Sequence, residues 1–118
     1  MSFDIQVARV YDPPGPGDGT RVLVDRLWPR GVPKGAFDQW CRSVAPSDEL
    51  RKWYGHDPQL FAEFARRYRA ELEDPERSAA VAKLRRLCEH GPLTLLTATG
   101  DVAISHATVL AERVPEWT

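Results

Sequence analysis

The sequence predicts a small α/β fold, with a mainly parallel sheet of three strands or slightly more and helices on both faces. Residues 21–26 and 93–98 each contain consecutive apolar side chains, which is typical of strands that are buried on both faces. Helical patterns separate these two runs, as a crossover between parallel strands requires. A chain of 118 residues suffices for one domain with a modest core, so we expect a single domain over residues 1–118.

The remaining strand and loop signals lie in the first third of the chain. Residues 3–11 alternate and are rich in Val, Ile and Phe, which predicts a further strand. Only about nine residues join it to the strand at 21–26, which is short for a parallel crossover, so the relative direction of these two strands stays open. Residues 28–37 read as an irregular loop, and Asp38–Ser43 are compatible with a short helical turn in which Trp40 faces the core.

Four helices are predicted from their start and stop signals. Ser or Asp stands at each start, where its side chain can accept a hydrogen bond from a free backbone N–H, and Pro follows it in two cases. The expected helices run from Ser47 to about Gly55, from Asp57 to about Glu73, from Asp74 to the stop at Gly91-Pro92, and onward from Asp101.

Composition and charge exclude several classes of protein. The chain is 42% apolar and 28% charged, with a net charge of −1, so nothing draws it in bulk to nucleic acid or to an anionic membrane. No apolar run is long enough to span a bilayer, and the first residues lack the features of a signal peptide. Cys41 and Cys88 have no metal-ligand spacing and are expected to be free thiols. We therefore expect a cytoplasmic protein.

Polar groups gather where two predicted strands end. If these strands are parallel, their carboxyl ends share one edge of the sheet, where open α/β sheets usually bind ligands. Two arginines next to a helix N-terminus suit a carboxylate, a sulfate or a phosphate, and a Trp beside them suits a flat ring. The residues expected at this edge are Asp25, Arg26, Trp28, Arg30, Thr97, Thr99, Asp101, Ser105 and His106.

Each of these side chains also has a structural interpretation. Asp25 and Arg26 can form an ion pair that braces the next loop, and Trp28 can be a core or lid aromatic. Asp101 can be a helix cap, and Thr97 can bond the backbone. Arg30 stands in a Pro/Gly loop where nothing obvious needs its charge, which makes it the best single ligand candidate.

Two histidines are candidates for proton transfer. His56 lies between a helix end and a helix start, where it can instead pair with a helix C-terminus. His106 stands beside the apolar stripe of the last helix, where it can instead be a satisfied border residue. If both converge with Asp101, a general base or a weak metal site would result. No metal-ligand spacing, phosphate-binding loop or dinucleotide fingerprint is present, so the sequence names no cofactor.

Four motifs carry a resemblance to a known family. The chain resembles the YeaO-like bacterial proteins, which belong to a wider family built on a domain of unknown function. The resemblance implies a cytoplasmic α/β protein with no established activity, and it adds Arg51 and His56 to the probable site. The motifs span residues 21–31, 46–56, 64–72 and 93–98.

Two departures from the family pattern limit what the resemblance implies. The wider family often has a Cys-His-Arg run after its last strand, where this chain has Ser105-His106-Ala107. The resemblance therefore does not extend thiol chemistry to this site. YeaO-like members tend to have a Tyr-x-x-Lys-like pattern after that strand, where this chain has Thr97-Ala-Thr-Gly100, so the role of that Lys does not carry over.

The sequence supports two hypotheses of different classes. In the first, the protein binds a small anion that bears phosphate or carboxylate, with Arg26 and Arg30 holding it, Trp28 covering it, and a histidine moving a proton if there is chemistry. In the second, it is a non-catalytic interaction module that uses Trp117 and the loop tryptophans. Nucleic acid is disfavoured by the net charge, and the oligomeric state, a homodimer included, stays open.

Overall fold

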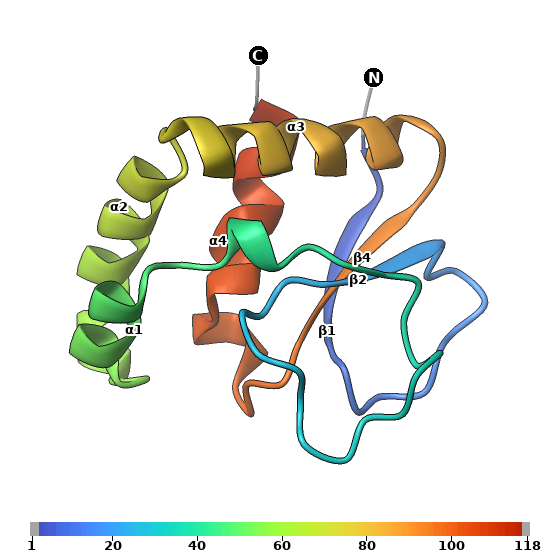
Figure 1. Cartoon of the computed structure of the whole chain (residues 1–118), viewed down its shortest axis with the longest axis horizontal. Coiled ribbons are helices and arrows are strands. Elements are labelled where there is room, and N and C mark those ends of the chain that lie inside the picture. The colour runs from blue at the N-terminus through green and yellow to red at the C-terminus, as the bar shows by residue number, and fades with distance from the viewer. Residues whose placement is uncertain (1–2, 117–118) are drawn as a thin grey trace.

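Figure 1 shows the computed structural model, which describes residues 3–116. It contains four strands, four α-helices and four short 3-10 turns within that range. The strands are β1 (Ile5–Arg9), β2 (Thr20–Leu23), β3 (Gln39–Trp40) and β4 (Leu93–Thr97). The helices are α1 (Asp48–Tyr54), α2 (Phe61–Glu71), α3 (Pro75–Glu89) and α4 (His106–Arg113). The 3-10 turns are η1 (Arg42–Val44), η2 (Pro58–Leu60), η3 (Val102–Ile104) and η4 (Val114–Glu116).

The four strands form one sheet in the order β1-β4-β2-β3, and all neighbouring pairs are parallel. Leu95 in the middle of β4 stands opposite Val7 of β1 on one side and Val22 of β2 on the other. All five residues of β4 are buried, as expected for a central strand. The predicted α/β fold with a small parallel sheet is confirmed. The open question about the first two strands is also answered, because they run in the same direction with β4 between them.

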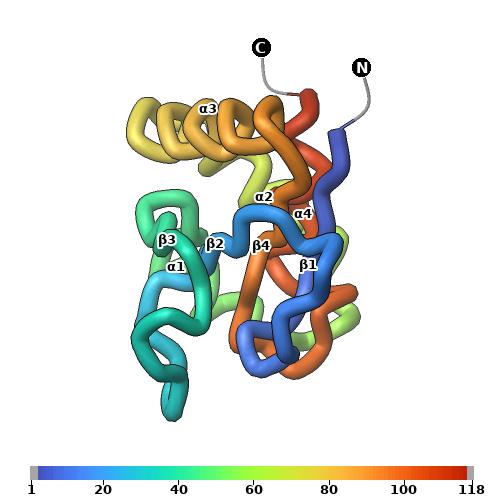
Figure 2. The backbone as a smooth tube through the Cα atoms, turned by 90° about the vertical axis from the view of Figure 1, so that its right-hand side faces the viewer, coloured from blue at the N-terminus to red at the C-terminus, as the bar shows by residue number. Residues whose placement is uncertain are grey.

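Different elements cover the two faces of the sheet (Figure 2). One face carries Val22, Val24 and Leu95, which pack against apolar side chains from all four α-helices. The other face carries Leu23 and Leu96, and the described residues that pack there come from strands and loops. The sequence predicted helices on both faces of the sheet, so the cover of this second face differs from that prediction. The connections after β1 and β2 are rich in Pro and Gly and lie back over this face, so no helix is needed to cover it.

The predicted helix starts agree with the structure in three cases. Ser47 accepts a hydrogen bond from the Leu50 N–H, and Asp74 accepts one from the Arg77 N–H. Asp57 caps η2, which leads into α2. Gly55 adopts the left-handed conformation (φ 55°) that often ends a helix.

Two local predictions need correction. Asp38–Ser43 do not begin as a helical turn, because Gln39 and Trp40 pair with β2 as the short strand β3, and only then does η1 follow. The last helix does not begin at Asp101. That residue caps η3, and α4 starts at His106, since Ser105 has an extended backbone that interrupts the helical path.

Candidate functional site

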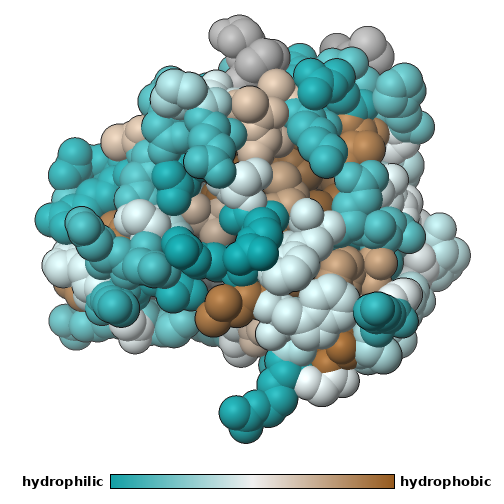
Figure 3. Space-filling model, viewed as in Figure 1, coloured by the Kyte–Doolittle hydropathy of each residue, from teal (hydrophilic) through white to brown (hydrophobic). Residues whose placement is uncertain are grey.

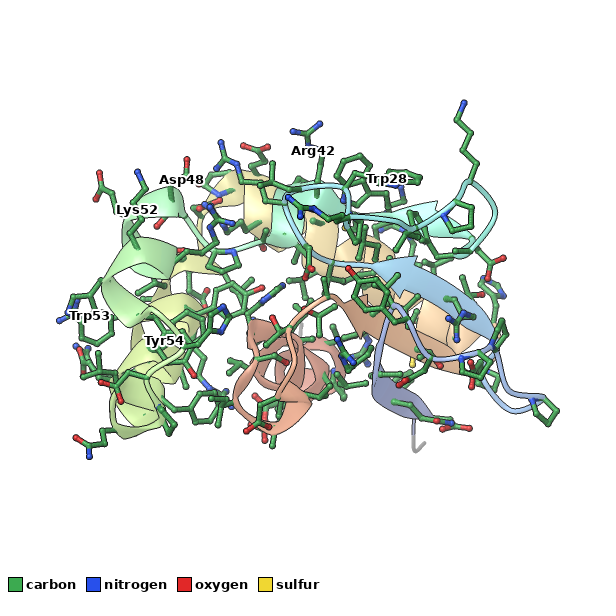
Figure 4. All side chains as sticks on the ribbon, turned by 90° about the horizontal axis from the view of Figure 1, so that it is seen from below. Trp28, Arg42, Asp48, Lys52, Trp53 and Tyr54 are labelled. Atoms are coloured by element: carbon green, nitrogen blue, oxygen red, sulfur yellow. The ribbon has the colours of Figure 1, made fainter. Side chains whose placement is uncertain are left out.

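A cleft of about 450 Å³ opens at the carboxyl edge of the sheet, between α1 and the segment that follows β2. Figure 4 views this edge from below, with Asp48, Lys52 and Tyr54 on α1 at one side and Trp28 across from them. The apolar part of its lining is Leu27, Trp28, Pro29, Ala45, Pro46, Phe64 and Ala98. The polar part is Asp25, Arg26, Arg51, Lys52, Tyr54, His56, Thr99 and His106.

Asp25 ties the end of β2 to the end of β4. Its Oδ2 accepts a hydrogen bond of 2.8 Å from the Ala98 N–H. Its Oδ1 is 3.6 Å from Nε2 of His106, is buried, and has no hydrogen-bond partner among the residues that the structure describes. Asp25 and Arg26 do not form the ion pair that the sequence allowed, because Arg26 turns to Asp48 instead. The Asp25 carboxylate therefore braces the site and keeps one unsatisfied acceptor.

His106, the first residue of α4, lies beside that carboxylate. Its Nε2 is 3.0 Å from the Val24 carbonyl oxygen, and the Tyr68 ring packs against its ring edge-on. Burial lowers the pKa of His106 below its usual value, and this outweighs the opposing effects of Asp25 and the Val24 carbonyl. The neutral ring thus donates from Nε2 to Val24, which leaves Nδ1 as its basic nitrogen.

The mouth of the cleft carries clustered positive charge. Nη1 of Arg26 and Nη2 of Arg51 lie 3.4 Å and 3.2 Å from the same oxygen, Oδ1 of Asp48. Lys52 is a further cation in the lining. All three side chains of the Arg26–Asp48–Arg51 group are partly exposed, so these ion pairs hold them only weakly. One carboxylate oxygen shared by two guanidinium groups leaves an excess of positive charge at the mouth.

His56 enters the cleft from a strained turn. Its φ is 57°, in the left-handed region that non-glycine residues rarely adopt, and Gly55 before it is left-handed too. Such a conformation costs on the order of 1–3 kcal/mol and occurs often at functional sites. The His56 side chain is exposed, and its ring lies 5.8 Å from that of Tyr54. His56 thus lines the cleft, and its role in ligand binding or proton transfer remains a prediction.

The Trp28 side chain packs against its neighbours and is also partly exposed to solvent. Its Nε1 donates a 2.8 Å hydrogen bond to the Val32 carbonyl, and its ring centroid is 5.0 Å from that of Phe37 and 5.5 Å from that of Trp40. The residue nevertheless remains 42% exposed. Trp28 is therefore a fixed, partly exposed aromatic surface at one end of the cleft, and its role in covering a ligand remains a prediction.

Three polar lining residues were not predicted as ligand-binding or catalytic, although Thr99 was expected at this edge of the sheet: Lys52, Tyr54 and Thr99. The Tyr54 hydroxyl donates to the Ile104 carbonyl, which joins α1 to η3, and burial raises its pKa, with Asp101 and Asp57 adding to the effect. Tyr54 follows Arg51 by three residues, so helical spacing places both on one face of α1. That spacing was the signal that could have identified it.

Three predicted ligand or catalytic residues lie outside the cleft lining. Arg30 is exposed in the loop after β2, where its carbonyl accepts a hydrogen bond from the Tyr11 hydroxyl. Thr97 is buried, and its Oγ1 accepts from the Thr99 N–H. Asp101 is exposed and accepts from the Ala103 N–H, as a cap does. Their roles in ligand binding or catalysis remain predictions. Trp117 lies outside the described residues.

No serine or cysteine side chain lines the cleft among the described residues. Ser105 is buried, and its hydroxyl donates to the Val102 carbonyl at 2.7 Å. Cys41 and Cys88 are both buried and free, which confirms that they are not bonded to each other, and neither lines the cleft. Between residues 3 and 116, no three His, Cys, Asp or Glu side chains are grouped so that they could hold a metal ion. In the same range, no helix has the length and apolar character needed to cross a membrane.

Comparison with known proteins identifies relatives along nearly the whole chain. An uncharacterised protein of Mycobacterium tuberculosis and another of Mycobacterium bovis are each 54% identical over 112 residues, covering 92% of this chain and 91% of theirs. The uncharacterised protein YeaO of Escherichia coli is 42% identical over 112 residues, covering 93% of this chain and 96% of its own. No solved structure matches. A family model described as the inactive DUF488-N3 subclade matches residues 4–117. The chain therefore belongs to the YeaO-like branch of this family of unknown function.

Proposed function

We propose that this protein binds a small anion, a metabolite that bears phosphate or carboxylate, in the cleft at the carboxyl edge of its sheet. The observation that carries the proposal is that Arg26 and Arg51 both approach Oδ1 of Asp48 at the mouth of the cleft. Guanidinium groups bind carboxylate and phosphate through paired N–H donors, and these two already point at an anionic oxygen. A ligand oxygen can join or replace that of Asp48, because the existing pairs are partly exposed and weak.

The proposal is for binding without covalent chemistry. The description of the family model as an inactive subclade supports this, as does Ser105, whose hydroxyl is committed to Val102 where the wider family often has a cysteine. His106 offers a basic nitrogen, but the described lining of the cleft contains no serine or cysteine for it to activate. Under this proposal, the neutral His106 and the Asp25 carboxylate shape the floor for recognition.

The proposal is tested by calorimetric titration of inorganic phosphate and of acetate into the wild type and into Arg26→Gln and Arg51→Gln variants. Each substitution removes one guanidinium while keeping a polar side chain, and we expect each to weaken phosphate binding roughly tenfold, or about 1.4 kcal/mol. Arg86→Gln is the matched control, since Arg86 is exposed on α3 and does not line the cleft. A His56→Asn variant should bind less tightly but stay as stable, because Asn tolerates the left-handed conformation.

Two outcomes contradict the proposal. In one, the wild type takes up neither phosphate nor acetate. In the other, the Arg86 variant loses as much affinity as the variants at the mouth of the cleft.

An interaction module is the second candidate, and one observation favours it. Leu27 is 62% exposed and stands next to the exposed Trp28, at the end of the cleft. Figure 3 shows hydrophilic side chains gathered over α1 and α2. Neighbouring exposed apolar side chains such as Leu27 and Trp28 are a candidate contact for a partner. If a partner covers Leu27, the Leu27→Ser variant should bind that partner less tightly than the wild type does. If the titrations detect no anion binding, sedimentation of the wild type and of Leu27→Ser tests this candidate. Self-association of the wild type that the substitution weakens would support an interaction at this face.

A further inference from the structure

A second hollow of about 380 Å³ lies next to the cleft, between η1 and the start of α3. Two residues, Arg26 and Ala45, line both spaces, so the two hollows adjoin and the Arg26 side chain stands between them. The rest of the lining of the second hollow is polar: Arg42, Ser43, Glu76 and Arg77.

The Arg26 side chain, which lines both spaces, is held only weakly. Its ion-pair partner in the described structure is Asp48, at 3.4 Å, and its side chain is 44% exposed. An Arg side chain is long enough to turn its guanidinium toward either space or to place one edge in each. Arg26 can therefore contact two anionic groups of one ligand.

The second hollow has a cation of its own that no carboxylate neutralises. The Arg42 guanidinium lies over the Trp40 ring at 5.0 Å, which holds it in place, and within residues 3–116 no carboxylate is in ion-pair contact with it. Arg77 also lines the hollow, but its Nε donates to the Ala45 carbonyl and its Nη1 to Asp74, so its charge is partly compensated. Arg42 is thus the principal anion-binding group of the second hollow.

We propose that the two hollows form one bipartite site for a small molecule with two phosphate groups on a hydroxylated frame. One phosphate would lie between Arg26 and Arg51, and the other between Arg26 and Arg42, with Arg77 alongside. Phosphate suits these positions because it offers several acceptor oxygens and nearly two charges to the forked guanidinium donors. This inference rests on the proposed function, and it names the class of anion.

Glu76 and Ser43 favour the hydroxylated frame. The Glu76 carboxylate in the second hollow repels an anion at close range, but it accepts hydrogen bonds from hydroxyl groups. The Ser43 hydroxyl can donate or accept there. A sugar between the two phosphates can donate hydroxyl groups to Glu76 and exchange hydrogen bonds with Ser43, which a plain hydrocarbon chain cannot do.

The test compares fructose 1,6-bisphosphate with fructose 6-phosphate by calorimetric titration into wild type, Arg42→Gln, Arg42→Lys and Arg51→Gln. We expect the wild type to bind the bisphosphate at least tenfold more tightly. Arg42→Gln should remove this advantage without changing the affinity for the monophosphate, and Arg42→Lys should restore most of it. Arg51→Gln should weaken both ligands. Thermal unfolding of each variant checks that it is folded, and Arg86→Gln is again the control.

A second pair of probes tests which molecular frame carries the two phosphate groups. Adenosine 3′,5′-bisphosphate and adenosine 5′-monophosphate repeat the comparison on a frame with an aromatic base, for which Trp28 is the nearest fixed ring surface. A larger gain from the second phosphate on either frame supports the bipartite site and says which frame fits.

Failure of this inference is distinguishable from failure of the proposed function. If fructose 6-phosphate binds and Arg42→Gln affects both fructose ligands equally, or neither, the bipartite site is wrong and the anion site at the cleft stands. If none of the four probes binds, the bipartite site is wrong, and the titrations of inorganic phosphate and acetate decide separately whether the proposed function stands. If a single-stranded oligonucleotide binds more tightly than any of them and Arg42→Gln weakens it, the hollows follow a nucleic-acid backbone and the small-molecule assignment is overturned.

Discussion

Asp25 and His106 form the least ordinary pair of residues in the molecule. A buried carboxylate oxygen without a donor costs free energy, and Nε2 of His106, 3.6 Å from Oδ1 of Asp25, donates its proton to the Val24 carbonyl instead. A second proton on the ring would give Asp25 a charged neighbour 3.6 Å away, but burial of the ring opposes that charge. The pair therefore makes His106 sensitive to any change in the polarity of the cleft.

This leads to a prediction about stability and pH. Because burial lowers the pKa of His106 in the folded protein, the unfolded chain binds a proton more readily, near its reference pKa of about 6.5. The free energy of unfolding should therefore fall as the pH drops from about 7.5 to 5.5. Urea unfolding at several pH values should show a shallower slope for His106→Gln than for the wild type.

His90→Gln serves as the control, since His90 is exposed at the end of α3. Glu63 does not confuse the result, because Arg66 and Arg67 lower its pKa to about 2 and its titration falls below this pH window. An unchanged slope in the His106 variant would contradict the assignment of a neutral buried ring.

At the residue scale, the sequence predicted which side chains meet at this edge of the sheet where the ends of strands determine their positions. Asp25 and Arg26 directly follow β2, and His106 follows β4 after one short turn, so the parallel sheet brings them together. Arg30 could not be placed, because the path of its Pro- and Gly-rich loop depends on tertiary contacts such as that with Tyr11. Thr97 faces inward because it is the last residue of a strand that is buried on both sides.

At the scale of elements, the position of α1 decides the shape of the cleft. The Ser47 N–H and hydroxyl both donate to the carboxylate of Glu71 at the end of α2, while the Ser47 oxygen also caps α1. This one residue thus starts α1 and fastens it to α2. Arg51 and His56 depend on it, because they stand on α1 and on the turn that follows.

We predict that Ser47→Ala lowers both stability and anion affinity. Loss of the cap alone should cost about 1 kcal/mol of the free energy of unfolding, and release of Glu71 should add to this. Phosphate binding should weaken as the α1 wall loosens. Asp74→Ala is the matched control, because it removes the cap of α3 at similar cost while leaving Arg26 and Arg51 in place. Equal losses of phosphate affinity in the two variants, each measured under conditions where it is fully folded, would count against the role of α1.

Helix starts were predictable, whereas the shortest strand was not. A cap is a local property, since Ser47 and Asp74 bond N–H groups three residues ahead, and the sequence shows it directly. The strand β3 has two residues and exists only because Gln39 and Trp40 meet Val22 and Leu23. Nothing local distinguishes such a pair from a turn, so the sequence pattern led to the wrong assignment there.

At the scale of the whole molecule, strand order was beyond the sequence. Three strands could be recognised by their composition, but the place of β4 between β1 and β2 follows from which apolar faces fit together. The same holds for the cover of the second face, where loop residues Val32 and Phe37 take the place expected for a helix. Patterns of hydrophobicity record that a side chain is buried and say little about what buries it.

The junction of β2 with β4 yields a prediction about the fold as a whole. Gly19 has a φ of 63°, and a Cβ there would lie 2.1 Å from the Pro92 carbonyl oxygen, which accepts a hydrogen bond from the Thr20 N–H. Gly19→Ala should therefore destabilise the protein by more than about 1 kcal/mol in urea unfolding. Gly17→Ala is the control, since a methyl group there would meet no atom within 4 Å and the backbone of Gly17 is not left-handed. Similar stability of the two variants would show that β2 can shift away from Pro92.

The central place of β4 also bears on how a cell makes this protein. While the ribosome translates the chain, β1 and β2 appear early, yet the strand that must lie between them is the last of the four to emerge. Until then, β1 has no partner strand and β2 can pair only with the two-residue strand β3, so free backbone groups along both strands invite unwanted pairing. We therefore expect folding to be largely delayed until β4 has left the ribosome, which gives chaperones a long interval to act on the nascent chain. A message truncated before Leu93 would yield a chain without the strand that joins β1 to the rest of the sheet.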